Sequence, residues 1–180
     1  MKIIIVYNSK TGFTKIYADW IAEELSCKTL SYNDFSEVII KEYDIVIFGS
    51  RIHVGKIEYL DKIKSCFDSK PDKELIVFAT GGTPCAAEEV INKIWSNNLT
   101  ESELKTIPHF YAQSGLNYEK MRFLDRIIMK TAAFFMSKMK NKDNNEVGFE
   151  QAIKNSYDNS SKKNIFPIVE YINNKTQNKK

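Results

Sequence analysis

Residues 3–14 have the sequence IIIVYNSKTGFT, and this stretch decides the fold. Its β-branched apolar start predicts a strand over residues 2–7, and an apolar run without alternation indicates a strand that is covered on both faces. A loop rich in hydroxyl groups follows, and a helical pattern begins near Lys15. A buried strand that leads through a polar loop into a helix is typical of an α/β protein.

The same pattern repeats along the chain. Further apolar runs lie at 44–49, at 75–80 and, more weakly, at 107–113, with an extra weak strand at 27–30. Helical patterns lie between them, at 20–25, 59–67 and 90–95. This alternation predicts a doubly wound parallel sheet with right-handed crossovers, in a single domain over residues 1–180. Ligands of such folds bind beyond the carboxyl ends of the strands, so the loops after the strands are the candidate sites.

The loop Asn8–Thr14 carries the best functional signal. Its hydroxyls, its glycine and the N–H groups of the helix start could cradle a phosphate dianion. The alternative is that Ser and Thr only cap the helix while Gly12 makes the turn. The chain lacks the G-x-G-x-x-G and G-x-x-x-x-G-K-[ST] patterns of other nucleotide folds. The first and third strands also lack the terminal acidic residues of a phospho-acceptor domain.

Two more loops follow strands, at 49–56 and at 80–84. Glycines in both would let the backbone approach a flat ring closely, and exposed N–H and C=O groups could bind the polar edge of such a ring. Taken singly, each loop could equally be a turn that needs glycine for its conformation. Together with the first loop, they predict a site for a planar cofactor that bears a phosphate.

The loop at 9–14 resembles the phosphate loop of the flavodoxin family, T/S-x-T-G-x-T. Residues 43–50 and 52–55 resemble the second flavin loop of that superfamily, especially the branch related to menaquinone-dependent protoporphyrinogen dehydrogenases. That branch carries a long insertion after the fifth strand, and residues 123–130 are similar to it. The resemblance implies a flavodoxin-like, doubly wound five-stranded parallel sheet of order 2-1-3-4-5, with a helical insertion at about 115–142, bound FMN and electron transfer through the flavin.

The resemblance also implies the site residues. The FMN phosphate would be held by Ser9, Lys10, Thr11, Gly12, Phe13 and Thr14. The isoalloxazine ring would be flanked on one side by Ser50, Arg51, Ile52, His53, Val54 and Gly55, and approached from another by Thr80, Gly81, Gly82 and Thr83. Neither ring loop contains Phe, Tyr or Trp, which flavodoxins usually stack on the flavin, so Tyr118 is a hypothetical source of an aromatic ring.

Residues 118–140 read as a basic amphipathic helix that is too interrupted by charge to span a bilayer. It could lie on an anionic membrane where a quinone meets the flavin, or cover a large apolar substrate with carboxylates. It could equally be an ordinary helix over a sheet edge or a dimer interface. Residues 1–117 carry 13 Lys and Arg against 16 Asp and Glu, whereas residues 118–180 carry 13 against 7, so the positive charge is concentrated in the last third.

Several other features of the sequence limit the possible functions of the protein. Three scattered cysteines and no visible export signal predict a cytoplasmic protein, with peripheral attachment to the inner face of the membrane as a second expectation. Two histidines, His53 and His109, are too few for a multi-histidine metal site, so we expect no metal. Cys85 after Pro84 could have a lowered pKa at a helix start, but a packed thiol is more common. We expect no nucleic acid partner, since no recognition motif accompanies the basic residues.

The leading hypothesis is therefore an FMN-binding, flavodoxin-like redox protein whose partner is a redox protein or a quinone. An alternative is a protoporphyrinogen-type dehydrogenase that passes electrons to a quinone. A second alternative is a flavodoxin-fold interaction module without flavin, which the missing aromatics would allow.

Overall fold

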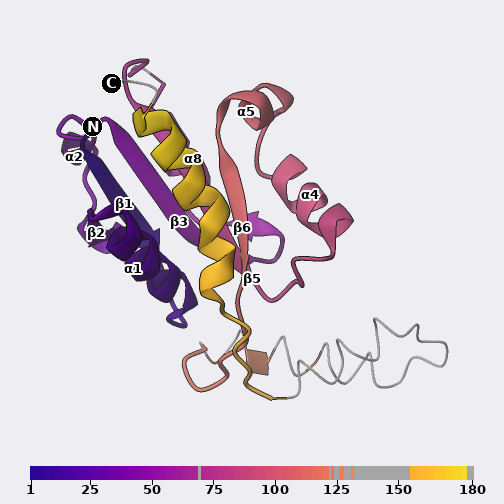
Figure 1. Ribbon diagram of the computed structural model, residues 1–180. Helices are drawn as coiled ribbons and strands as arrows, with labels where there is room; N and C mark the ends of the chain where they lie inside the picture. Colours follow the sequence, from indigo (N-terminus) through magenta and orange to yellow (C-terminus); the bar gives the residue numbers. More distant parts are fainter. Residues whose placement is uncertain (69, 122, 124–125, 128–130, 132–154, 178–180) are drawn as a thin grey trace.

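The computed structural model describes residues 1–68, 70–121, 123, 126–127, 131 and 155–177. Its parallel strands are β1 (Ile3–Asn8), β2 (Lys28–Ser31), β3 (Ile45–His53), β5 (Glu74–Gly81) and β6 (His109–Gln113), and a short β4 (Lys56–Ile57) pairs antiparallel with the end of β3. The sheet has the order β2-β1-β3-β5-β6 (Figure 1). Counted among the parallel strands this is 2-1-3-4-5, so the predicted fold class is confirmed.

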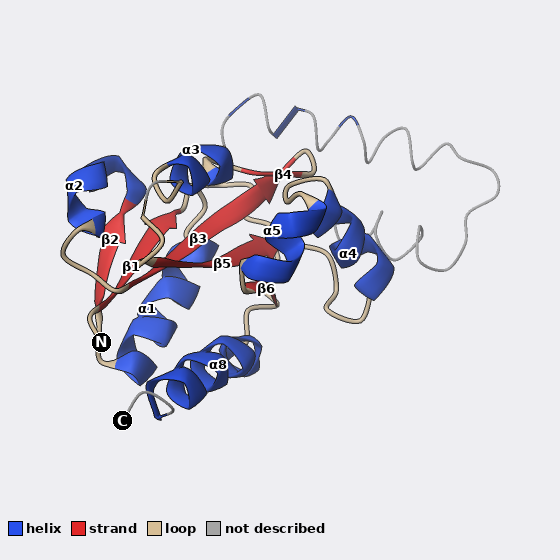
Figure 2. Ribbon diagram, turned by 90° about the horizontal axis from the view of Figure 1, so that it is seen from above, coloured by secondary structure: helices blue, strands red, loops and turns tan. Residues whose placement is uncertain are grey.

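Helices cover both faces of the sheet. One face carries α1 (Phe13–Leu25) and α8 (Phe166–Gln177), which follows the short 3-10 helix η2 (Lys162–Ile165). The other face carries α2 (Glu37–Ile40), α3 (Leu60–Ser65), α4 (Glu88–Ser96) and α5 (Glu101–Thr106), as Figure 2 shows. A second 3-10 helix, η1 (Tyr32–Asp34), follows β2. The apolar runs lack alternation because both faces of the central strands are buried.

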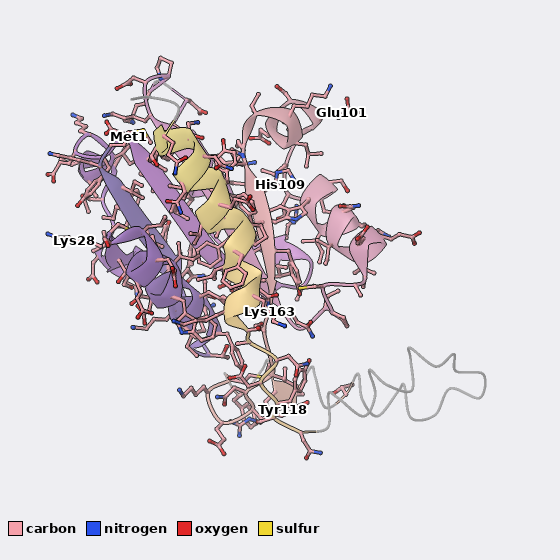
Figure 3. The ribbon with its side chains drawn as sticks, in the orientation of Figure 1. Met1, Lys28, Glu101, His109, Tyr118 and Lys163 are labelled. Atoms are coloured by element: carbon pink, nitrogen blue, oxygen red, sulfur yellow. The ribbon has the colours of Figure 1, made fainter. Side chains whose placement is uncertain are left out.

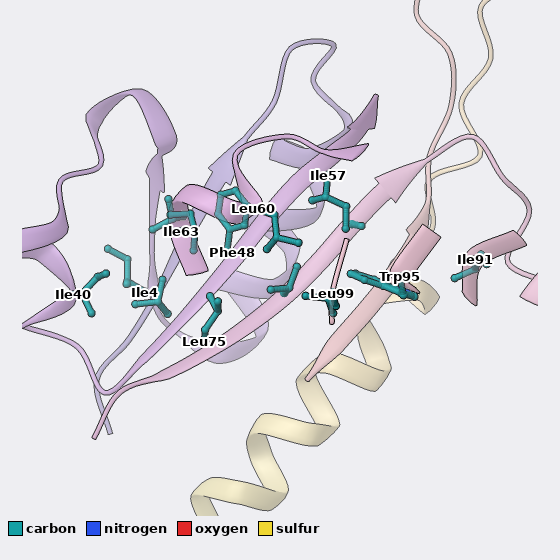
Figure 4. Packing of buried hydrophobic residues seen from close by; sticks show 14 residues of the cluster. Ile4, Ile40, Phe48, Ile57, Leu60, Ile63, Leu75, Ile91, Trp95 and Leu99 are labelled. Carbon is teal, nitrogen blue, oxygen red and sulfur yellow. The ribbon is translucent and has the colours of Figure 1, made fainter. Parts of the chain in front are cut away.

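The core is correspondingly divided in two by the sheet. On the α3 and α4 side, Phe48 and Leu60 pack with Trp95, and all three side chains are at most 4% exposed (Figure 4). On the α1 and α8 side, Tyr17 and Ile172 are fully buried. Full burial of one such side chain contributes about 1.5–3 kcal/mol, so these two layers hold the helices against the sheet.

The structure extends the sequence prediction at three places. β3 continues to His53 rather than ending near Gly49, because the hairpin with β4 supplies pairing partners for its polar end. α2 and α5 are additional short helices, and α5 is capped by a reciprocal hydrogen-bond pair between Thr100 and Glu103. Most of the predicted helix at 118–140 lies outside the described residues, as does much of the insertion at 115–142.

The turn between β3 and β4 contains a strained residue. Val54 has φ 50° and Gly55 has φ 75°, so both central residues are left-handed, as in the turns that suit tight hairpins. A β-branched residue in this region costs about 1–3 kcal/mol, whereas asparagine tolerates it better.

We therefore expect Val54→Asn to stabilise the protein by about 1 kcal/mol, measured as a higher midpoint of urea unfolding. Val54 is 82% exposed, so little packing is lost in the exchange. A matched change at the exposed Val38, which has an ordinary backbone, should give no such gain. A lower midpoint for Val54→Asn would contradict the strain argument.

Candidate functional site at the carboxyl ends of the strands

The three predicted loops meet at one edge of the sheet. Asn8 at the end of β1 donates a hydrogen bond from Nδ2 to Oγ of Ser50 in β3, at 3.1 Å. The hydroxyls of Thr14 and Thr80 lie 2.8 Å apart, and both residues are at most 2% exposed. The start of α1 is thereby tied to β5. Residues 66 apart in the sequence are brought together because parallel strands end at the same edge.

The first loop has the geometry of an anion cradle. Gly12 is the N-cap of α1 and has φ 101°, a left-handed conformation that favours glycine. Gly12 makes the turn, as the capping alternative expected, but the Ser and Thr side chains do not cap the helix, because the N-cap residue has no hydroxyl and Thr14 bonds Thr80 instead. Oγ of Ser9 is buried and has no hydrogen-bond partner among the described residues. A buried hydroxyl without a partner costs about 1–3 kcal/mol, and a phosphate oxygen would satisfy it. The loop therefore fits a phosphate group.

The second predicted loop is largely a strand. Gly49 to His53 belong to β3 and Lys56 to β4, and only Val54 and Gly55 form the turn, so the expectation of a loop over 49–56 is corrected. Ser50 is fully buried, whereas Val54 stands at the exposed tip of the hairpin. Alternate residues of a strand point to opposite faces, so Arg51 and His53 share one side. That side is occupied by a carboxylate that the sequence analysis missed.

Glu58, just after β4, gathers the charged groups of the site. Its carboxylate accepts hydrogen bonds from Nζ of Lys10 at 2.9 Å and from Nδ2 of Asn8 at 3.0 Å. Arg51 donates two more, from Nε at 3.0 Å and Nη2 at 2.9 Å. Nδ1 of His53 lies 4.0 Å from Oε1 of Glu58.

The pKa of the Glu58 carboxyl reflects these contacts. Burial would raise this pKa, but the hydrogen bonds from Arg51, Lys10 and Asn8 outweigh burial and lower the pKa to about 2. Glu58 is therefore ionised at neutral pH, and it joins the first loop to the β3–β4 hairpin. The two cations that it binds are Lys10 of the first loop and Arg51 of β3.

The third predicted loop begins inside β5, since Thr80 and Gly81 are strand residues and Gly82 and Thr83 follow them. The Tyr111 hydroxyl lies 2.7 Å from the carbonyl oxygens of both Gly81 and Thr83, and it can donate to one of them at a time. Burial raises the pKa of Tyr111, so this hydroxyl remains protonated. The loop is held in place from β6.

The structure also places the other residues that the sequence singled out. The side chain of Phe13 is 8% exposed and packs in the core, so only the backbone N–H of this first residue of α1 could contact a phosphate. His109 lies in β6, where its ring centroid is 4.8 Å from that of Trp95. Cys85 is exposed and precedes α4 by three residues, so it is not at a helix start. The backbone N–H of Tyr118 donates to Oγ of Ser156, which places Tyr118 at the end of the molecule opposite Met1 (Figure 3).

Among the described residues, no group of three His, Cys, Asp or Glu side chains is placed to hold a metal ion. No helix in the described ranges has the length and apolar character needed to cross a membrane.

The chain is similar to several known proteins. It is 37% identical over 90 residues to an uncharacterised protein of Methanocaldococcus jannaschii, a match that covers 47% of this chain and 57% of that protein, a little over half of its length. Flavodoxin 2 of Bacillus cereus matches with 20% identity and a TM-score of 0.41, over 62% of this chain and 84% of that one. Flavodoxin 1 of the same organism matches with 17% identity and a TM-score of 0.42, over 78% and 100%.

Residues 4–146 match the model of the flavodoxin domain. Because this match covers well over half of its residues, the chain belongs to the flavodoxin domain family.

Proposed function

We propose that this flavodoxin-domain protein binds FMN and transfers electrons through it. The observation that carries the proposal is the buried hydroxyl of Ser9, which has no partner among the described residues and lies in the loop before the N-terminus of α1. Family membership supports a flavin as the ligand, and the loop that fits a phosphate favours FMN over unphosphorylated flavin.

Each part of the site has a proposed task. Ser9, Thr11 and the first N–H groups of α1 would hold the phosphate, while Gly12 keeps that turn open. The carboxyl end of β3 from Ser50 to His53, with the turn at Val54 and Gly55, and the segment from Thr80 to Thr83 at the end of β5 would flank the ring. Tyr111 and Glu58 do not contact the ring in this proposal; they position those two elements. The flavin, when bound, would supply the electron chemistry.

Ser9→Ala tests the proposed contact between Ser9 and the phosphate through two measurements, stability and FMN affinity, which should not fall together. Without flavin, the variant should be at least as stable as the parent, because a buried hydroxyl without a partner is removed. With flavin, its FMN affinity should fall about tenfold, the value of one hydrogen bond to a charged group. Urea unfolding and quenching of FMN fluorescence measure the two effects.

Ser96→Ala is the matched control, since Ser96 is exposed at the end of α4. It should change neither readout. A Ser9→Ala protein that is less stable and binds FMN as tightly as the parent would contradict the assignment of Ser9.

The electron donor and acceptor belong to the proposal as well. The excess of positive charge in residues 118–180 favours an anionic partner, which a redox protein, an acidic substrate or an anionic membrane surface with its quinone pool would provide. Oxidation of protoporphyrinogen by the FMN-loaded protein, with quinones as acceptors, tests the dehydrogenase alternative directly. Turnover of protoporphyrinogen would establish that alternative, whereas reduction of the flavin by a reductase without any turnover would favour an electron carrier.

We propose a cytoplasmic location. Attachment to the inner face of the membrane is the second possibility, and sedimentation of the protein with vesicles of anionic lipid would test it.

A further inference from the structure

A lysine from outside the predicted site lies over the first loop. Nζ of Lys120 is 3.7 Å from the position that a Cβ atom on Gly12 would occupy. Gly12 is the N-cap of α1, so the ammonium group is placed beside the helix N-terminus. Lys120 follows β6 by seven residues and belongs to the segment that Figure 1 shows at the lower edge of the molecule, where the strands end.

Lys10, the lysine of the first loop, is paired with Glu58. Nζ of Lys10 donates to Oε1 of Glu58 at 2.9 Å, and the side chains of both residues are largely buried, at 26% and 17% exposed. An ammonium group held by a carboxylate is a weak counter-charge for a second anion, because the carboxylate repels that anion. Of these two lysines, Lys120 is therefore better placed than Lys10 to neutralise a phosphate on this loop.

The backbone around Lys120 is fixed. Leu116 and Tyr157 exchange both backbone hydrogen bonds, each at 2.9 Å, in an antiparallel bridge. Gly115 allows this approach, because a Cβ there would lie 1.9 Å from the carbonyl oxygen of Tyr157. The N–H of Lys120 then donates to Oδ1 of Asn117 at 3.1 Å.

The same bridge reaches the third loop. The hydroxyl of Tyr157 lies 2.9 Å from the position of a Cβ on Gly82. The two chain segments that join at the bridge thus lie over the first and third loops at once. The backbone that carries Lys120 is therefore joined to a framework that spans the site, and this framework places the lysine near Gly12.

We propose that Lys120 binds the phosphate of the flavin and makes the site selective for FMN over riboflavin. The proposal rests on the proposed function, since it assigns one residue to the same site. The phosphate would be neutralised jointly by the N-terminus of α1 and by the ammonium group of Lys120. Riboflavin has the same ring but no phosphate, so the contribution of Lys120 should be absent for riboflavin.

The test measures dissociation constants of FMN and riboflavin for the full chain, by quenching of flavin fluorescence. Lys120→Gln should weaken FMN binding about tenfold and leave riboflavin binding within about twofold, since a charged hydrogen bond is lost only for FMN. Lys120→Arg should retain most of the FMN affinity, because it keeps the positive charge. The dependence of FMN affinity on salt should be shallower in Lys120→Gln than in the parent.

Lys105→Gln is the matched control, because Lys105 is an exposed lysine of α5, before β6. It should leave both affinities unchanged. An unchanged FMN affinity in Lys120→Gln, or an equal loss for FMN and riboflavin, would overturn the role of Lys120 while the proposed function stands. A parent protein that binds neither flavin would overturn both, so the two failures are distinguishable.

Discussion

Replacement of Gly49 by alanine is expected to destabilise the protein by about 3 kcal/mol, because the new methyl group has no space. A Cβ on Gly49 would lie 2.0 Å from Cζ of Phe78, and that ring is 2% exposed. The two residues are direct partners on the neighbouring strands β3 and β5, and on its other side β3 pairs with β1, so neither strand can move away freely. A loss of this size is a large part of the stability of an ordinary domain.

Urea unfolding of a double-mutant cycle measures this effect. Phe78→Leu removes the ring that causes the clash, so Gly49→Ala should cost clearly less in the Phe78→Leu background than in the parent. A cost below about 1 kcal/mol in the parent, or the same cost in both backgrounds, would show that the ring does not pack on Gly49 as described.

Replacement of Glu58 by glutamine is expected to lower stability by about 3 kcal/mol at neutral pH. The pKa of this carboxyl falls from the ordinary 4.5 to about 2 on folding, and one pKa unit corresponds to about 1.4 kcal/mol. The neutral amide would also leave Lys10 and Arg51 beside each other without their carboxylate.

The effect should depend on pH in a defined direction. A carboxyl whose pKa is lowered by folding contributes its full stability above the pKa of the unfolded chain, near 4.5, and loses it as the pH falls toward 2. The difference in stability between the parent and Glu58→Gln should therefore be constant above about pH 5.5 and shrink steadily below pH 4.5. Urea unfolding of both proteins at pH values on both sides of 4.5 measures this difference in stability.

Glu23→Gln serves as the control, because Glu23 pairs with Lys162 at the surface and its side chain is 68% exposed. Exposed pairs contribute little, so this variant should match the parent at every pH. Equal stability of Glu58→Gln and the parent at neutral pH would mean that the Lys10, Arg51 and Glu58 cluster does not join the loop to the hairpin.

The sequence was sufficient for the parts of the fold that local patterns determine. Apolar runs at residues 3–6 and 75–79 predict buried strands because both faces of the sheet are covered, and the order of strands and helices then allows few topologies. The hydroxyl-rich loop with Gly12 predicted an anion cradle for the same local reason, since the loop and the helix start are adjacent in the chain.

The parts that the sequence did not predict depend on contacts between distant residues. The polar end of β3, from Ser50 to His53, does not look like a strand, and it becomes one because β4 pairs with it. Glu58 was missed because its partner Lys10 is 48 residues away. The opposite charges of Arg51 and Glu58, which lie equally far from the turn at Val54 and Gly55, were an available signal of a hairpin.

Lys120 was missed for the same reason, since its place over Gly12 follows from the bridge between Leu116 and Tyr157. Sequence spacing alone cannot show that a residue after β6 reaches the loop after β1. The site is therefore a composite of a loop that the sequence reveals and of charged residues that only the folded chain brings to it.

The most direct test of the account is the amount of flavin that the parent protein retains. The purified chain is mixed with excess FMN, desalted, and measured by visible absorption against protein concentration. We expect close to one FMN per chain, with little riboflavin retained under the same treatment. A chain that is folded by circular dichroism and retains no FMN would contradict the proposed binding of FMN.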